Sequence, residues 1–250
     1  MRSLIHTLLA DISGMTRKEH LLYWIIPILV LAICMLFYFS EIPELVSIIC
    51  PPGNWEWGIV ENLQLVIILG IFILAIRGFS RKTDRLLKWG FGLTAIFAIF
   101  ILLEEMDYGE HFAQYIMGVE EVFSEKFIPI DNLHNRGNNA KIFKRSIYLV
   151  MLLIFIIAPF TKPIIKNRYL RFLIPRPSII LVAVLTVIAD LVPRLVVLFQ
   201  WRKDGGFGVN IGEFSEIMVY HIFFIYMLQL VYFNVLETNT KDPEHSTPQK

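Results

Sequence analysis

Long hydrophobic runs separated by short polar segments dominate this 250-residue chain. A transmembrane α-helix needs about 20 mostly apolar residues, and six runs reach or approach that length. The pattern therefore predicts an all-α integral membrane protein, a bundle of about six transmembrane helices. The expected spans cover residues 21–40, 57–76, 89–106, 146–161, 178–199 and 213–236.

The segments around these spans define the expected organisation. Residues 1–20 predict an amphipathic cytoplasmic lead-in, and residues 21–237 predict a single transmembrane domain. Residues 238–250, polar and interrupted by proline, are typical of a disordered cytoplasmic tail. The segment 107–145 is long enough to cap the outer face, and connections of that length are often functional.

Composition agrees with a membrane protein. Hydrophobic residues make up 56% of the chain and charged residues 18%, against about 25% charged residues in soluble domains. A formal net charge of +1 argues against the concentrated basic surface that general nucleic-acid binding requires. Cys34 and Cys50 lack the spacing of a zinc knot or disulfide scaffold, so we interpret them as small apolar side chains.

The distribution of Lys and Arg predicts the orientation of the bundle. Most of the 23 basic residues fall in the lead-in, in the segments 77–88 and 162–176, and in the tail. Cytoplasmic loops have an excess of Lys and Arg, so both termini are predicted to be cytoplasmic. Most acids lie toward the opposite, outer ends of the spans. The expected location is the bacterial cytoplasmic (inner) membrane, as a multi-pass protein.

Polar residues converge on the expected outer ends of four spans. In the second span, Glu61 and Gln64 share a helical face, and Asn62 lies beside Glu61. The sixth span begins with Glu213 and Glu216, which also share a face.

The end of the third span adds further acids. Glu104, Asp107 and His111 follow one another at spacings of three and four, so one helical stripe would present all three if the helix continues. Glu105 is expected to face elsewhere. The long outer segment adds His134, within Asn-Leu-His-Asn.

The fifth span contains Asp190 and Arg194 at a spacing that suits an intrahelical ion pair. This pair has a structural interpretation, because each charge offsets the energetic cost of placing the other in the membrane. Acids at a helix start favour the helix dipole, so Glu213 and Glu216 fit a cap as well as a site. His221 alone is more often a packing residue. Acids from three spans at similar depth nevertheless favour a shared site.

Several carboxylates in a dry pocket require a cation, an arginine or bound protons. We assign the roles as follows. The expected catalytic acid–base residues are Glu61, Glu104, His134 and Glu216. The expected substrate-binding residues are Arg194, Asn62 and Gln64. The expected metal ligands are Glu104, Asp107, His111, His134 and Glu213, a nitrogen and oxygen set that suits zinc, iron or manganese if a divalent metal binds.

Two short motifs resemble a group of uncharacterised bacterial polytopic membrane proteins. That group has two glutamates, two spacers and Trp-Gly-Gln, then a loop ending in Asn-Leu-His-Asn. This chain has Glu-Glu-Met-Asp-Tyr-Gly-Glu at 104–110 and Asn-Leu-His-Asn at 132–135. Tyr108 replaces the Trp and Glu110 replaces the Gln. The resemblance covers about thirty residues and implies no particular reaction.

A second, weaker similarity is to alkaline ceramidase-type membrane hydrolases. It rests on residues 57–62, where Trp57 and the adjacent Glu61 and Asn62 resemble the Trp and Glu-x-Asn entry of those hydrolases. Those hydrolases hold zinc with three histidines, two of them in a late His-x-x-x-His pair. Here His221 stands alone in the last span, so no zinc triad is transferred to this chain.

These observations predict a membrane-embedded enzyme, metal-dependent if a divalent metal binds, that acts on a lipid or lipid-linked substrate at the outer leaflet. One alternative is a proton- or cation-coupled transporter or channel, which uses similar acids. Another is a noncatalytic membrane accessory subunit with a protein partner or a second copy of itself. Transport requires polar groups that continue toward the cytoplasm, and the inner halves of the spans have few, among them Thr186, Gln229 and Asn234.

Overall fold

The computed structural model describes residues 2–40, 42–49, 58–106, 117, 139–199 and 211–234, which are helical wherever their secondary structure is regular and include no β-strand. The elements are α1 (Arg2–Ser13), α2 (Arg17–His20), η1 (Leu21–Ile25), α3 (Ile26–Tyr38), α4 (Pro43–Ile49), α5 (Ile59–Arg81), α6 (Arg85–Glu105), α8 (Asn139–Met151), η4 (Leu152–Ile157), η5 (Ala158–Phe160), α9 (Arg168–Leu173), α10 (Ile179–Leu198), α11 (Ile211–Leu228) and η6 (Gln229–Phe233).

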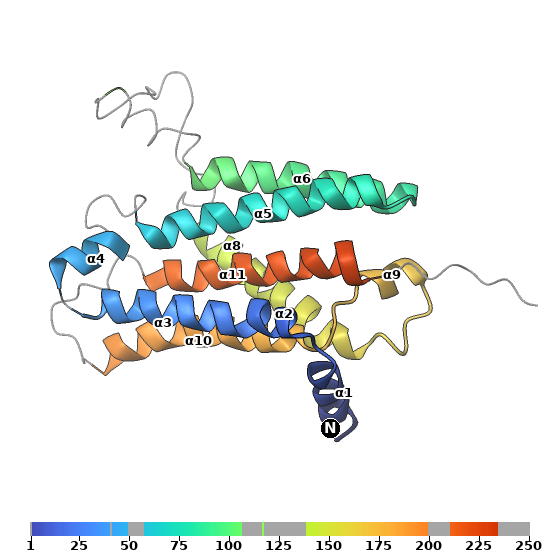
Figure 1. The fold of residues 1–250 in the computed structure, drawn as a ribbon, viewed down its shortest axis with the longest axis horizontal. Helices are drawn as coiled ribbons and strands as arrows, with labels where there is room; N and C mark the ends of the chain where they lie inside the picture. The colour runs from blue at the N-terminus through green and yellow to red at the C-terminus, as the bar shows by residue number, and fades with distance from the viewer. Residues whose placement is uncertain are drawn as a thin grey trace, which may run out of the picture.

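The long helices lie side by side along one axis (Figure 1). α5 packs extensively against both α6 and α11, and α11 packs against α10 on its other side. α5 and α11 run in the same direction, whereas α6 and α10 run in the opposite direction. α1 projects from the bundle across its long axis (Figure 1). This arrangement places the first turns of α5 and α11 at the same end as the last turn of α6.

Four helical segments within the described residues are long and apolar enough to cross a membrane. They are Arg17–Tyr38, Ile59–Arg81, Arg85–Glu105 and Glu213–Phe233. Two more segments, Arg145–Phe160 and Ile179–Val192, are apolar but shorter. The predicted all-helical membrane architecture is thus confirmed at the level of four candidate spans.

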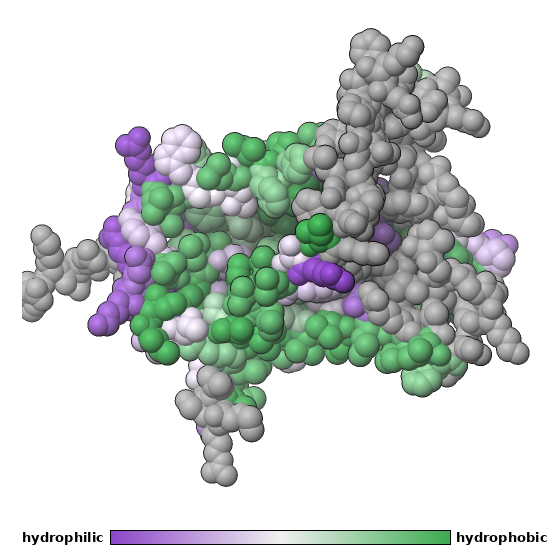
Figure 2. All heavy atoms as spheres, turned by 180° about the vertical axis from the view of Figure 1, so that it is seen from behind, coloured by the Kyte–Doolittle hydropathy of each residue, from purple (hydrophilic) through white to green (hydrophobic). Residues whose placement is uncertain are grey.

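α11 forms the centre of the bundle. Phe214, Met218, Ile222 and Ile225 are fully buried along it. The outer faces are apolar as well, as Figure 2 shows for one side, with Ile96 of α6 exposed to 69%. A continuous apolar exterior around a packed core is expected where lipid replaces water.

The helix ends differ from the prediction where α5 meets α6. α5 continues to Arg81 and α6 already begins at Arg85, so most of the expected loop 77–88 is helical. The turn is short because Asp84 caps α6: its Oδ1 accepts hydrogen bonds from the N–H groups of Leu86 (3.0 Å) and Leu87 (3.1 Å). The hydrophobicity pattern did not detect this continuation, because the ends of both helices contain charged residues.

The fourth expected span also begins earlier. α8 starts at Asn139, within the segment assigned to the outer loop 107–145. The tail at 238–250 and most of that loop lie outside the described residues.

Candidate functional site

Two parallel helices begin next to each other with an acid in the first turn of each. Glu61 lies in the first turn of α5, and Glu213 lies in the first turn of α11. The N-terminus of a helix bears a partial positive charge, which favours carboxylates. This local preference explains how two acids can begin neighbouring apolar helices.

The side chains of α5 and α11 meet directly. Glu61 and Gln64 are buried, with 4% and 0% of their surface exposed. The amide Nε2 of Gln64 donates to Oε2 of Glu213 at 2.8 Å and approaches its main-chain oxygen at 3.5 Å. The carboxyl groups of Glu61 and Glu213 also lie close enough to interact electrostatically. The predicted shared face of Glu61 and Gln64 therefore points at the start of α11.

α6 joins this group through Glu105. The hydroxyl of Tyr220 on α11 donates to Oε1 of Glu105 at 2.7 Å. Glu61 interacts electrostatically with Glu105 and Glu216, and Tyr220 interacts with the same acids. The expectation that Glu105 faces elsewhere is wrong, because its carboxylate turns toward α11. We call the set Glu61, Gln64, Glu105, Glu213, Glu216 and Tyr220 the carboxyl cluster.

A signal for the two missed residues was present in the helical periodicity. α6 buries Phe91, Ala95 and Ala98, and seven residues after Ala98 the same stripe reaches Glu105. Tyr220 follows Glu216 by four residues, so it shares that face of α11. Buried small residues in α6 were thus a better guide to its inner face than the acids themselves.

Glu104 is buried to the same extent as Glu61, with 4% of its surface exposed. It lies with Glu105 in the last turn of α6, where the helix dipole disfavours a negative charge. The hydroxyl of Tyr220 partly offsets this cost for Glu105. Acids retained at this unfavourable end have no helix-capping explanation, which distinguishes them from Glu61 and Glu213.

Two buried oxygens of the carboxyl cluster have no hydrogen-bond partner in the described structure. They are Oε2 of Glu61 and Oε1 of Gln64. Leaving a buried acceptor unsatisfied costs about 1–3 kcal/mol, and such atoms are rare in folded proteins. Both oxygens would be satisfied by a proton donor, a water molecule or a cation. The carboxyl cluster can therefore accept a further hydrogen bond or bind a cation at these two oxygens.

Other residues expected at the site lie elsewhere or are not described. Asn62 is exposed, and its side chain donates to the carbonyl of Gly58 at 2.9 Å, so it supports the start of α5. The backbones of Asp190 and Arg194 are helical in α10, but the Arg194 side chain lies outside the described part, as do Asp107, His111 and His134. Within the described residues, no three His, Cys, Asp or Glu side chains are placed to hold a metal ion.

Polar groups continue along α11 beyond the carboxyl cluster. His221 is half-buried and lies near the backbone of Leu22 and Tyr23 in the π-helical turn η1. Its Nε2 atom has no partner among the described residues. π-helical turns inside helices are frequent at functional positions. The interior is thus less apolar than the sequence pattern predicts.

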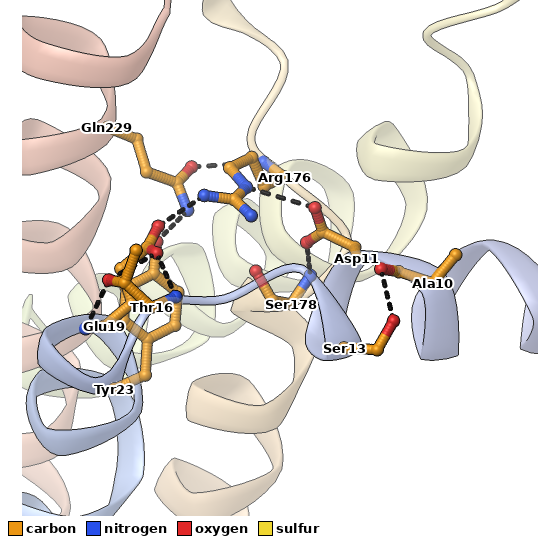
Figure 3. Close-up of polar contacts among 9 residues, drawn as sticks. All are labelled: Ala10, Asp11, Ser13, Thr16, Glu19, Tyr23, Arg176, Ser178 and Gln229. Carbon is orange, nitrogen blue, oxygen red and sulfur yellow. Dashed lines mark hydrogen bonds and ion pairs between the residues drawn. The ribbon is translucent and has the colours of Figure 1, made fainter.

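A polar network closes the opposite end of the bundle (Figure 3). Arg176 donates through Nη1 to Glu19 and through Nε to Oδ1 of Asp11 at 3.1 Å. Oδ2 of Asp11 accepts from the N–H of Ser178 at 2.8 Å. Burial disfavours the charge of Arg176, but the Asp11 and Glu19 carboxylates outweigh it and raise the pKa of Arg176.

The same network reaches α11 through its C-terminal extension η6. Oε1 of Gln229 accepts from the N–H of Arg176 at 3.1 Å, and its Nε2 donates to the hydroxyl of Tyr23 at 2.6 Å (Figure 3). Thr16 and Glu19 form a capping box at α2. These groups satisfy one another, so we interpret the network, named here the arginine hub, as structural.

No protein-family model, curated protein or solved structure matches this chain.

Proposed function

We propose that the protein is a six-span integral membrane protein of the bacterial inner membrane, with cytoplasmic termini and the carboxyl cluster at the outer end. Four spans are the long apolar segments, and Arg145–Phe160 and Ile179–Val192 supply the two shorter ones. The turn between α5 and α6 is rich in Lys and Arg and lies at the end away from the carboxyl cluster. Positive residues favour the cytoplasmic side, which supports this orientation.

We propose further that the protein is a membrane-embedded enzyme acting on a lipid or lipid-linked substrate at the outer leaflet. The supporting observation is that the carboxyl group of buried Glu61 lies close to that of Glu213, beside two unsatisfied oxygens. Neighbouring carboxyl groups in such surroundings are favoured when they share a proton, so that one is an acid while the other is a base. Paired carboxyls of this kind divide acid and base roles in several enzyme classes.

The remaining cluster residues supply supporting roles in this proposal. Gln64 orients the Glu213 carboxyl group through the 2.8 Å hydrogen bond. Tyr220 holds Glu105 and offers a second proton-bearing group close to Glu61 and Glu216. Glu104 and His134, predicted as catalytic from the sequence, extend the acid–base set toward the outer segment.

A divalent metal is a separate part of the proposal. Its ligands would be Glu104, Asp107, His111, His134 and Glu213, with zinc, iron or manganese as the fitting metals. Elemental analysis of the purified protein tests it. Stoichiometric metal that is lost in a folded Glu104→Ala, His134→Ala double variant supports the metal, and metal-free wild-type protein purified without chelators refutes it.

A second candidate is proton-linked transport. It is favoured by His221, whose buried Nε2 lacks a described partner, between the carboxyl cluster and the arginine hub. Tyr23 and Gln229 extend the polar groups to the far end of the bundle. Ionisable groups spaced across a membrane are characteristic of proton relays.

The two candidates separate on a single substitution, Glu61→Gln. Glu44→Gln is the matched control, because Glu44 of α4 is an exposed acid at the same end of the bundle and belongs to no predicted site. If the enzyme proposal holds, expression of the wild-type protein changes the lipid profile of the membrane. Glu44→Gln retains that change, and Glu61→Gln reduces the rate of conversion about 100-fold or more.

Mass spectrometry of extracted lipids measures this conversion, at equal amounts of monodisperse protein. Proton flux into proteoliposomes is measured with the same three proteins. If the lipids are unchanged and Glu61→Gln abolishes a proton flux that the wild-type protein shows, the protein is a transporter and not an enzyme. If Glu61→Gln changes neither lipid conversion nor proton flux, the carboxyl cluster is not the functional site.

A further inference from the structure

Two arginines lie on one aromatic ring at the end of the bundle opposite the carboxyl cluster. Arg77 and Arg81 are one turn apart near the end of α5, and both side chains approach Tyr232 of η6. Their Cζ atoms lie 5.5 Å and 5.0 Å from the centroid of the Tyr232 ring. The ring stabilises each cation but contributes no net charge. Two like charges are thus held together, although residues at this spacing repel.

The acid in the adjacent turn does not relieve this repulsion. Asp84 accepts a hydrogen bond from the Tyr169 hydroxyl at 3.0 Å and lies 3.9 Å from Arg168. Within the described residues, neither Arg77 nor Arg81 has an acidic partner. Among the residues that the structure describes, the pair thus presents two guanidinium groups with no acid beside them, a donor arrangement that suits a phosphate.

Exposed aromatic and apolar residues lie at the same end of the bundle as the pair. Phe79 and Trp89 are exposed at the same end, and Nζ of Lys88 lies 5.9 Å from the Phe79 ring. Aromatic and basic residues gather at the level of lipid headgroups, and Figure 2 shows hydrophilic residues concentrated at this end. One turn deeper on the same stripe as Arg77 lies Ile73, with 55% of its surface exposed.

We propose that Arg77, Arg81 and Tyr232 form a binding site for the headgroup of an anionic phospholipid. The guanidinium groups bind the phosphate, and the Tyr232 ring supports both of them side by side. The stripe that continues to Ile73 contacts the acyl chain. This combination of a charged end and an apolar continuation fits an amphiphile better than free phosphate. The site is independent of the function proposed for the carboxyl cluster.

Native mass spectrometry of the full-length protein in detergent, with equal phosphatidylglycerol and phosphatidylcholine, tests the site. We expect preferential retention of phosphatidylglycerol. Arg77→Gln, Arg81→Gln together weaken that retention about tenfold or more. The control is Arg85→Gln, Lys166→Gln, which removes the same charge from exposed positions at the same end and leaves retention within about twofold.

Tyr232→Leu provides a second variant that keeps every charge. It weakens phosphatidylglycerol retention severalfold, because the two guanidinium groups lose their common support. Equal losses in the Arg77, Arg81 double variant and the control would overturn the site, since net charge alone would explain them. Displacement of phosphatidylglycerol by millimolar inorganic phosphate would overturn the lipid as its ligand. Circular dichroism verifies that each variant retains its helix content.

Discussion

At the scale of single residues, buried carboxylates in this chain are compensated in two different ways. Glu19 accepts hydrogen bonds from Arg176 and Thr16, so its charge has partners on both oxygens. Glu61 lies beside the carboxyl group of Glu213 and leaves Oε2 unsatisfied. An interaction that costs stability is often retained where it serves function. This contrast directs attention to Glu61 rather than Glu19.

The contrast predicts that Glu61→Gln does not destabilise the protein. A glutamine amide supplies N–H donors, and it can satisfy the Gln64 oxygen or the Glu213 carboxylate without a bound proton. We expect its thermal unfolding midpoint in detergent to equal or exceed that of the wild type, while function is lost. Glu61→Leu is the comparison, because it removes the partner of Glu213 and lowers the midpoint. A midpoint for Glu61→Gln as low as that of Glu61→Leu would contradict this account.

Residue-scale prediction from the sequence succeeded where helical spacing determines the face. Glu61, Gln64 and Glu213 were expected near one another, and they are in contact. Glu105 was assigned the wrong direction because the stripe was drawn through the acids Glu104 and Asp107. Packing of α6 against α5 determines its inner face, and that information lies in the buried residues Ala95 and Ala98. The predicted roles of Asp107, His111 and His134 stay predictions.

At the scale of elements, close approach of α5 to α6 depends on a glycine. A Cβ added at Gly78 would lie 2.7 Å from Cγ of Phe91, the buried end of that side chain. Phe91 is itself 5% exposed and has little room to move. The contact therefore requires glycine, although glycine lowers helix propensity.

We predict that Gly78→Ala destabilises the protein by about 1–2 kcal/mol, since overpacking outweighs the gain in helix propensity. Gly90→Ala, in α6, is the matched control because an added Cβ there meets nothing within 4 Å. It should stabilise the protein by up to about 1 kcal/mol. Unfolding titrations in mixed detergent micelles measure both. Similar effects of the two substitutions would show that Gly78 is not a packing requirement.

The N-terminus of α6 provides a pH-dependent prediction. Hydrogen bonds from the N–H groups of Leu87 and Leu86 and from the Tyr169 hydroxyl lower the pKa of Asp84 below its ordinary value of 3.8. A depressed pKa means that the stabilisation is present at higher pH and is lost as the pH falls through the folded value. We expect Asp84→Ala to lower the unfolding midpoint at pH 7, and we expect this difference to shrink as the pH falls below 3.8 and through the lower folded pKa.

Asp84→Asn separates the two contributions at this position. Asparagine still caps a helix but does not titrate, so its unfolding midpoint should lie between those of the wild type and Asp84→Ala at pH 7. A difference between wild type and Asp84→Ala that persists unchanged at low pH would show that the carboxylate charge is irrelevant.

Element existence was easier to predict than element ends. Hydrophobic runs identified the four long spans, because apolar length is a direct requirement of the bilayer. The continuation of α5 through Arg77 to Arg81 was missed, since basic residues at a helix end resemble a loop in a hydrophobicity profile. Long Arg side chains can lie along the helix and place their charge at the membrane interface, so basic residues are compatible with the last turns of a transmembrane helix.

At the scale of the whole molecule, the two ends of the bundle have opposite polar chemistry. The carboxyl cluster at one end contains acids and unsatisfied acceptors. The arginine hub at the other end pairs Arg176 with Asp11 and Glu19 and satisfies Gln229 and Tyr23. A site that exchanges a ligand or proton benefits from a scaffold fixed elsewhere, so the hub is expected to provide rigidity to the bundle.

This division predicts a large effect of Arg176→Met on stability. The substitution leaves Glu19, whose side chain is 7% exposed, without its cation, and removal of one partner of a buried pair costs about 3–5 kcal/mol. Arg176→Met combined with Glu19→Gln should recover part of that loss, because glutamine can still complete the capping box at α2. Lys166→Met, at an exposed position, is the control and should be nearly neutral.

Unfolding by denaturing detergent, followed by circular dichroism, measures all four proteins. If the hub only stabilises, the double variant regains function in proportion to its recovered stability. The carboxyl cluster lies at the far end of the bundle, so its chemistry does not depend on the charge of Arg176. Loss of function in a double variant as stable as the wild type would contradict this view and would make the hub part of a pathway that links both ends through His221.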